Sequence, residues 1–391
     1  MVEWIGWLLK VVYLYGHLIG VRNFEFDWRT GRVYKSIRST FYASGIHAII
    51  LISLAMMTFR HLNIWMIFGK SNMLLKYVLT LVFGLRILAG LSTVLIRWPQ
   101  RTLMMQFART VLRLFLQRPQ VMQMSRWGVL FKIIITSVTD LLQVISIWIA
   151  WDRRRSDQTL GIFLQYWMSA IVNLAIAEHY LAILFVRAYY NLLNTELRQV
   201  MEECQKLSNH PQRRGAFMTR CCDLADQLDD IAQLQSELIS MVTQLGEALG
   251  IQGLMVYGGY YIFSIATVYL SYSIFKTGYD NLDMTVTSMI LTFIWCSFYY
   301  LDALLNLFIT LNLLDDHKDI KRLLEERTLF ASRLDIRLEE SFDRMQLQLI
   351  QNPLKTDILK TFSITRESSM AMLGSVIMHS IILIQFDLEF F

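Results

Sequence analysis

Seven long apolar runs, almost free of charged residues, constrain this chain more than any other feature. The hydrocarbon core of a bilayer is about 30 Å thick, and an α-helix needs about 20 apolar residues to cross it. Runs of roughly this length or longer occupy residues 39–59, 74–96, 129–150, 160–186, 252–275, 285–312 and 368–386. They predict an all-α, polytopic membrane protein with seven transmembrane helices.

An eighth apolar run, at residues 4–21, differs from the others. Lys10 lies near its centre, where a charge costs roughly 2.5–3.5 kcal/mol in a membrane-spanning helix. Its Trp and Tyr residues suit the level of the lipid headgroups. We therefore predict a helix that lies at the membrane interface. An extra span is the alternative.

The orientation follows from Lys and Arg, because cytoplasmic loops are enriched in these residues. Of the eight segments outside the spans, four carry 28 Lys and Arg residues and the alternate four carry 6. The rich segments are 1–38, 97–128, 187–251 and 313–367; the poor ones are 60–73, 151–159, 276–284 and 387–391. The N-terminus is thus predicted inside, and seven spans then place the C-terminus outside. A G-protein-coupled receptor has the opposite orientation.

The two long cytoplasmic segments carry apolar stripes at helical spacing. The stripes consist of Leu224, Leu228, Ile231, Leu234, Leu238, Val242, Leu245 and Leu249, and of Leu334, Leu338, Phe342, Met345 and Leu349. We expect the two faces to pack on each other as a cytoplasmic helical anchor bundle.

These features divide the chain into seven parts. They are a cytoplasmic N-terminal segment with the interfacial helix (1–38), the first four spans (39–186), a cytoplasmic helical extension (187–251), spans five and six (252–312), the anchor helices (313–367), the last span (368–386) and an extracellular tail (387–391).

The last span ends in the most specific motif of the chain. It reads Met378-His379-Ser380-Ile381-Ile382-Leu383-Ile384-Gln385-Phe386. This resembles the signature of the insect gustatory receptors, relatives of the odorant receptors, in which Thr-Tyr, five mostly apolar residues and Gln-Phe close the last helix. Gln385 and Phe386 match, whereas Met378 and His379 replace Thr and Tyr. Chain length, span number, orientation and the long polar segment before the fifth span agree with the family over the whole chain.

The resemblance implies a ligand-gated, non-selective cation channel in the plasma membrane of gustatory sensory neurons. It implies a homo- or hetero-tetramer with other gustatory receptors, whose last helices line one central pore. Carried over by position, the pore and gate residues are Gln385, Phe386, Ile382 and His379, and Asp387 and Glu389 lie at the outer pore mouth. A ring of Phe386 and Ile382 could gate by dewetting. Because no sugar or carbon dioxide signature is present, we expect a bitter or aversive tastant.

Ionisable groups inside the spans are candidates for function, although polar networks between helices are the alternative. They are Arg86, Asp140, Glu178, His179, Asp302 and His379. Aromatic and polar side chains in the outer halves of the spans suit a pocket for a small organic ligand. These candidates are Asp140, Gln143, Tyr166, Trp167, Tyr269, Tyr272, Trp295 and Tyr299. Ordinary packing or lipid contact is the alternative for each aromatic.

Signatures of enzymes do not occur: there is no GxSxG, HExxH, P-loop or paired CxxC. We expect no enzymatic activity, no metal or cofactor and no nucleic-acid partner. The expected partners are a small-molecule tastant, membrane lipids and other receptor subunits. The alternative functions are a metabotropic seven-helix receptor and, with less support, a membrane transporter.

Overall fold

The computed structural model describes residues 3–27, 32–59, 73–151, 159–209, 214–277, 286–327, 334–358 and 362–390. Within these residues, seven helices are long and apolar enough to cross a membrane. They are α2 (Ile37–Phe59), α3 (Met73–Ile96), α6 (Arg126–Trp151), α7 (Thr159–Asn209), α8 (Arg214–Thr277), α9 (Val286–Glu326) and α11 (Arg366–Phe390). Each contains one of the seven predicted spans, apart from residue 285, which lies outside the described residues. The prediction of a seven-span helical membrane protein is therefore confirmed.

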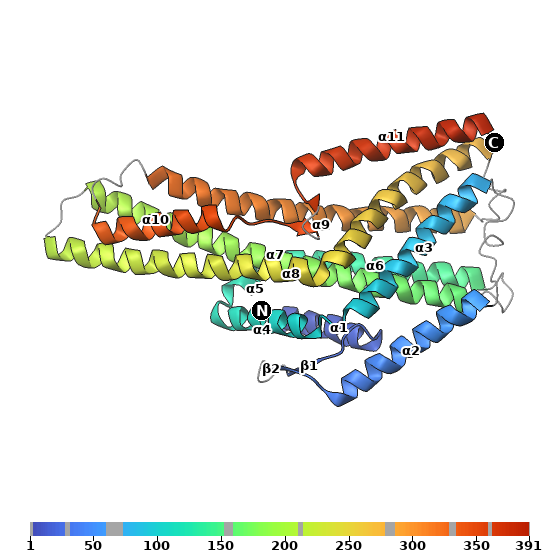
Figure 1. Ribbon diagram of the computed structural model, residues 1–391, viewed down its shortest axis with the longest axis horizontal. Helices are drawn as coiled ribbons and strands as arrows, with labels where there is room; N and C mark the ends of the chain where they lie inside the picture. Colours follow the sequence, from blue (N-terminus) through green and yellow to red (C-terminus); the bar gives the residue numbers. More distant parts are fainter. Residues whose placement is uncertain are drawn as a thin grey trace.

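The helices run alternately along the long axis of the molecule (Figure 1). We call the end at which α2 ends and α3 begins the outer end, following the orientation predicted from charge, and the opposite end the inner end. At the inner end α7, α8 and α9 extend well beyond α2 and α3 (Figure 1). The predicted boundaries at 186, 251 and 312 thus fall inside continuous helices, because a helix crosses the membrane surface without a break. The short outer connections lie outside the described residues.

The inner extensions are held together by an apolar core. The predicted stripes of α8 and of α10 (Ile336–Gln351) belong to one buried cluster, as expected. Phe342 is 1% exposed and Met345 is fully buried. Burying such a side chain contributes about 1.5–3 kcal/mol. The Asp335 carboxylate caps the N-terminus of α10 by accepting a hydrogen bond from the Arg337 amide at 3.0 Å.

Helix α7 forms the centre of the membrane region. In its most apolar stretch 89% of the residues are buried, against 11–28% in the other six spans. Small residues allow neighbours to approach it: a Cβ on Gly90 of α3 would lie 2.7 Å from the Met168 sulfur of α7. The other spans therefore surround α7 and turn much of their apolar surface outward.

The N-terminal helix α1 (Glu3–Leu18) does not lie flat across the bundle. Trp4 and Leu9 pack against the inner core, whereas Tyr15 packs against the cluster formed by α2, α3 and α7. The chain then turns at Gly20, whose φ is +83°, and runs back towards the inner end before α2 begins (Figure 1). Helix α1 thus packs along the side of the bundle, and its place at the membrane interface stays a prediction. Trp4, Leu9 and Tyr15 pack on other helices, whereas Trp7, Val11, Leu14 and Leu18 of α1 are exposed.

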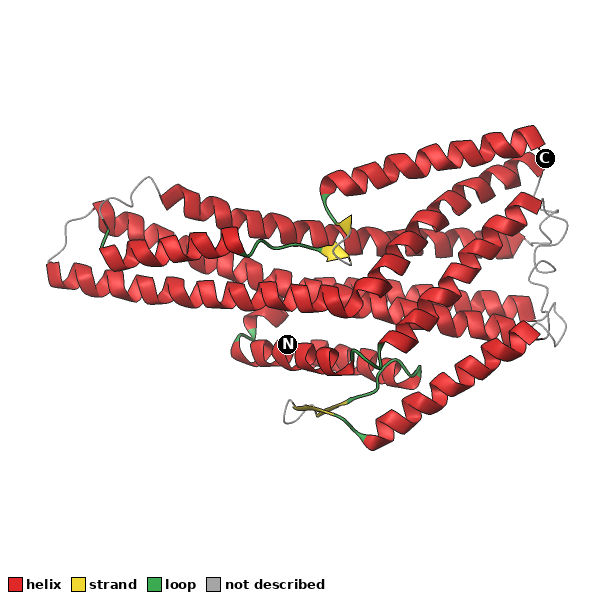
Figure 2. Cartoon of the chain, viewed as in Figure 1, coloured by secondary structure: helices red, strands yellow, loops and turns green. Residues whose placement is uncertain are grey.

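Short elements complete the inner half (Figure 2). Strands β1 (Glu25–Asp27) and β2 (Arg32–Tyr34) pair antiparallel, as do β3 (Asp357–Ile358) and β4 (Phe362–Ser363). Helices α4 (Arg101–Gln117) and α5 (Gln120–Met124) connect α3 to α6. The β3–β4 hairpin lies between α10 and α11, so it joins the inner bundle to the last span.

Candidate functional site

The last helix, α11, lies at the margin of the molecule and packs along α8 (Figure 1). Its two buried residues, Ser380 and Asp387, are on the face toward α8. At about 100° per residue, Ile382, Gln385 and Phe386 lie on the opposite side, within about 100° of arc. All three are exposed in the single chain, and so are His379 and Glu389. The residues predicted for pore, gate and outer mouth thus share one uncovered face of α11, with the exception of Asp387.

Asp387 lies on the face toward α8. It is 2% exposed, accepts a hydrogen bond from the Tyr269 hydroxyl at 2.7 Å and pairs with the Lys276 ammonium at 2.8 Å. Because α11 remains helical to Phe390, residue 387 turns toward α8 instead of leaving the helix as part of a solvated tail. Within the single chain the Asp387 carboxylate thus binds α8, and its place at the outer pore mouth stays a prediction. For Glu389, which is exposed, a place at the pore mouth stays a prediction.

His379 lies at the edge of the uncovered face. Its Nδ1 is 3.0 Å from the Tyr261 hydroxyl of α8, and the same hydroxyl is 2.8 Å from the Ser375 hydroxyl of α11. These contacts tie the middle of α11 to α8, as Asp387 ties its outer end.

An aromatic cluster surrounds Arg86 about midway along the membrane spans. The Arg86 guanidinium carbon lies 4.9 Å from the ring centre of Trp295 and 5.7 Å from that of Tyr299. The two rings stack at 5.5 Å, and Phe263 of α8 meets both edge-on. Tyr260 adds a ring 4.9 Å from Tyr299. Cation–π contacts of this kind are worth about 2 kcal/mol or more when desolvated.

Arg86 has unused binding capacity. Its Nη2 is buried and has no hydrogen-bond partner in the described part of the chain. Beside it, a cavity of about 40 Å³ lies between α3, α7, α8 and α9. An oxygen acceptor on a ligand would satisfy this nitrogen, and the ligand would have to widen the cavity by displacing side chains.

The predicted ligand residues separate into three places. Trp295 and Tyr299 belong to the Arg86 cluster, whereas Tyr269 and Tyr272 stack 6.1 Å apart next to Asp387. The Asp140 carboxylate accepts hydrogen bonds from Tyr15 of α1 at 2.8 Å and from Asn173 at 2.7 Å.

Three more of the predicted ligand residues are Tyr166, Trp167 and Gln143. Tyr166 lies near Tyr15, and the Trp167 indole donates to the Ile19 carbonyl at 3.1 Å. The Gln143 side-chain oxygen is buried without a partner in the described residues. Asp140 and Tyr166 therefore contact α1, Trp167 contacts the turn after it, and their part in ligand binding stays a prediction.

Several other ionisable groups in the spans form pairs between helices. Glu178 of α7 binds Arg22 at 2.9 Å and Arg97 at 2.5 Å. Lys132 of α6, fully buried, binds Asp302 of α9 at 2.5 Å. A buried charge left unpaired costs several kcal/mol, so these pairs maintain the helix arrangement.

From the sequence, Arg86 was predicted only as an ionisable group inside a span and not as part of the ligand pocket. Tyr260 and Phe263 were not predicted for the pocket either. The available signal was an intramembrane arginine without an obvious acidic neighbour on its own helix. Its partners come from α8 and α9, and their side chains meet only when the helices pack.

Seven helices that are long and apolar enough to cross a membrane place the chain in the class of multi-pass membrane proteins. The family model described as 7tm Chemosensory receptor matches residues 9–390. The chain belongs to this family of chemosensory receptors.

Relatives from Drosophila melanogaster agree. The chain is 51% identical to putative gustatory receptor 36a and 50% identical to putative gustatory receptor 36b, each over 391 residues and the full length of both chains. It is 32% identical to putative gustatory receptor 59d over 395 residues, again covering all of both chains. The resemblance to gustatory receptors inferred from the last helix is thereby confirmed.

Solved structures show the same fold. The insect olfactory receptor OR5 from Machilis hrabei matches with a TM-score of 0.66, covering 97% of each chain at 10% identity. Its complex with eugenol matches with a TM-score of 0.65, covering 98% of each chain.

Proposed function

We propose that this protein is a taste receptor that acts as a ligand-gated, non-selective cation channel for bitter or aversive small molecules. The observation that carries the proposal is the uncovered face of α11. Ile382, Gln385 and Phe386 lie there, while Asp387, which accepts a hydrogen bond from Tyr269 of α8, lies opposite. Four copies of such a helix around an axis would line a pore with these residues.

The tetramer, the plasma-membrane location in gustatory neurons and the outside C-terminus belong to the same proposal. They are supported by the family membership and by the charge distribution of the sequence. In this arrangement Phe386 and Ile382 form apolar rings that exclude water from the closed pore.

The Arg86 cluster is the proposed tastant site. Its aromatic walls favour flat, apolar molecules, and the unpartnered Arg86 nitrogen favours one oxygen acceptor on them. To open the channel, the tastant must bind the open state more tightly than the closed state.

The test is ligand-evoked current in a heterologous cell that expresses the full chain, alone and with other gustatory receptors. Phe386→Ala is expected to raise the current without ligand, because a smaller ring dewets less readily. The matched control is Leu388→Ala, which truncates an exposed apolar residue two positions on, about 120° away from Ile382 around the helix.

The outcome separates the alternatives. Current that depends on intracellular G-protein signalling would indicate a metabotropic receptor. Uptake of a solute without current would indicate a transporter. If both variants reach the surface and Phe386→Ala and Leu388→Ala have the same current without ligand, the proposed pore face is wrong.

A further inference from the structure

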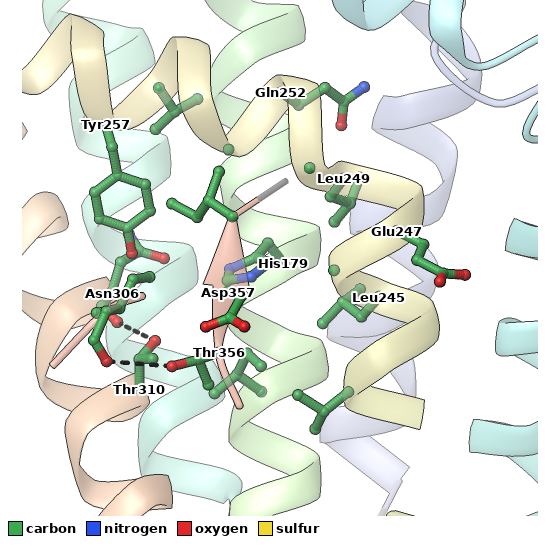
Figure 3. Close-up of a pocket in the computed structure, with 18 of the residues that line it drawn as sticks. His179, Leu245, Glu247, Leu249, Gln252, Tyr257, Asn306, Thr310, Thr356 and Asp357 are labelled. Atoms are coloured by element: carbon green, nitrogen blue, oxygen red, sulfur yellow. Dashed lines mark hydrogen bonds between the residues drawn. The ribbon is translucent and has the colours of Figure 1, made fainter. Parts of the chain in front are cut away.

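A second, larger cavity lies near the inner ends of the spans. Arg86 does not line it. It has a volume of about 700 Å³ and is lined by α7, α8, α9, the segment 353–358 that contains β3, and Ile364 (Figure 3). Pockets for drug-sized ligands typically measure about 300–1,000 Å³. The size therefore fits one small organic molecule.

One side of this inner cavity is apolar. Leu245 and Leu249 of α8 line it, as does Ile183 of α7. Figure 3 shows the two leucines on the α8 side and His179 of α7 between them and the β3 segment. This wall would bury the hydrocarbon part of a ligand, at about 25 cal/mol for each Å² removed from water.

The other side carries polar groups whose hydrogen-bonding capacity is not used. The Asn306 side-chain oxygen and the Tyr260 hydroxyl are buried without a hydrogen-bond partner in the described part of the chain. Asn306 is 5% exposed and Tyr260 is 6% exposed. In Figure 3 Tyr257 lies on the same side as Asn306. An unsatisfied buried polar group costs about 1–3 kcal/mol, so a ligand that donates a hydrogen bond here would recover part of this cost.

The charged residues of the lining are at its rim. Glu247 and Lys355 are exposed and Asp357 is half-buried. A charged ligand in the interior would have no buried opposite charge, and burying an unpaired charge is far more costly than burying a hydroxyl. The interior thus suits an uncharged molecule.

We propose that this inner cavity is a second small-molecule site, which binds an uncharged, mainly apolar compound carrying a hydroxyl or amide donor. The donor bonds the Asn306 oxygen while the apolar part packs against Leu245 and Leu249. The site is centred apart from the Arg86 cluster, although Ile176 and Val256 line both cavities and Tyr260 lies between them, against Tyr299 and in the wall of the inner cavity. Its existence does not depend on whether the protein conducts ions.

The wall formed by the β3 segment gives the site a particular position in the fold. Asp357 and Ile358 lie close to α8, where glycines leave room: a Cβ on Gly246 would be 3.5 Å from the Asp357 carbonyl oxygen. Along the chain, the same segment is followed by β4 and then by α11. A molecule in the inner cavity would therefore contact both α8 and the connection to the last helix.

The experiment is photolabelling of the full-length receptor in lipid nanodiscs with an octanol that carries a diazirine on its alkyl chain. Mass spectrometry then locates the adducts, with and without excess unlabelled octanol. We expect saturable labelling in peptides from 242–260 and 353–364, which excess octanol abolishes. Labelling that excess octanol leaves unchanged reflects partitioning into lipid and would overturn the proposal.

Two variants test the chemistry of the site. Asn306→Leu removes the acceptor and should lower the saturable labelling about tenfold, the loss expected for one buried hydrogen bond. Asn312→Leu, on the same helix, also removes a buried amide with an unpartnered atom but does not line the cavity, so it should label normally. Leu249→Trp should block labelling by filling the space. Variants are compared only where they elute as the same species as the parent receptor, and equal labelling of Asn306→Leu, Leu249→Trp and the parent would exclude the site.

Discussion

At the scale of single residues, Arg86 is the most unusual group in the membrane region. A guanidinium in a span usually pairs with a carboxylate or faces water. Arg86 instead lies over the faces of Trp295 and Tyr299, and no ion pair of Arg86 is found in the described part of the chain. Because Arg86 has aromatic neighbours and no ion pair among the described residues, its Nη2 donor stays available for a ligand.

The first prediction follows from this availability. Replacing Arg86 with Met keeps most of the side-chain length but removes the charge and the donors. Hydrogen bonds to charged groups contribute about 1.5–3 kcal/mol, so the tastant concentration for half-maximal current should rise about 10- to 100-fold. Lys76→Met on the same helix is the control, because Lys76 is outside the cluster and should leave the dose–response curve in place. An unchanged curve for Arg86→Met would remove the aromatic cluster from the ligand site.

The sequence predicts which kinds of residue form this site, but it does not predict which side chains they contact. Trp295 and Tyr299 could be selected because aromatic residues gather in the outer part of one span. Arg86 could not be joined to them, since its contacts depend on how α3 rotates against α9. Asp387 shows the same limit: its partner Lys276 is 111 positions away, and only the continuation of α11 brings the two together. Spacing along one helix predicts a face, but not the residue that the face meets.

At the scale of elements, the periodicity of apolar residues predicts the packing of α8 on α10 but not the packing of α1. The stripes of α8 and α10 could be matched because each shows a long repeat of apolar residues. Helix α1 could not be placed in this way, because its fit depends on the sharp turn at Gly20 and on polar contacts such as Arg22 with Glu178. A short apolar run with a central lysine is compatible with a helix at the membrane interface and with a helix that is partly inserted.

The second prediction concerns the turn that ends α1. At Gly20 the backbone is left-handed, and a Cβ would lie 2.7 Å from the Ile46 side chain. Gly20→Ala should therefore cost about 1–2 kcal/mol for the backbone and about 1–3 kcal/mol for overpacking. The apparent melting temperature of the purified receptor is expected to fall.

Gly45→Ala provides the matched control for this turn. Gly45 lies in α2, and a Cβ there would meet no atom within 4 Å. Ala in a helix interior is favoured over Gly by about 0.5–1 kcal/mol, so this variant should be as stable as the parent or slightly more so. Equal melting temperatures for Gly20→Ala and Gly45→Ala would contradict the packing of α1 along the bundle.

At the scale of the whole molecule, the number of spans and their alternation could be predicted from hydropathy alone, since lipid imposes helices of a minimum length. The inner bundle follows from the long extensions of α7, α8 and α9. Hydropathy does not determine which face of α11 remains uncovered, because the contact with α8 depends on particular pairs such as Asp387 with Tyr269.

The last prediction tests the orientation on which the roles of the two ends depend. The sequence has no Asn-x-Ser/Thr acceptor for glycosylation, so one engineered acceptor gives an unambiguous signal. An acceptor placed after Phe391 on a flexible Gly/Ser linker should be glycosylated, because the charge distribution places this end outside. The same cassette inserted between His210 and Arg213, between the inner ends of α7 and α8, should stay unmodified. Sensitivity of the first protein to a glycosidase, seen as a mobility shift, and insensitivity of the second would establish the topology. The reverse pattern would place the last helix in the orientation of a G-protein-coupled receptor, and Phe386 would then lie near the cytoplasm and not at an outer gate.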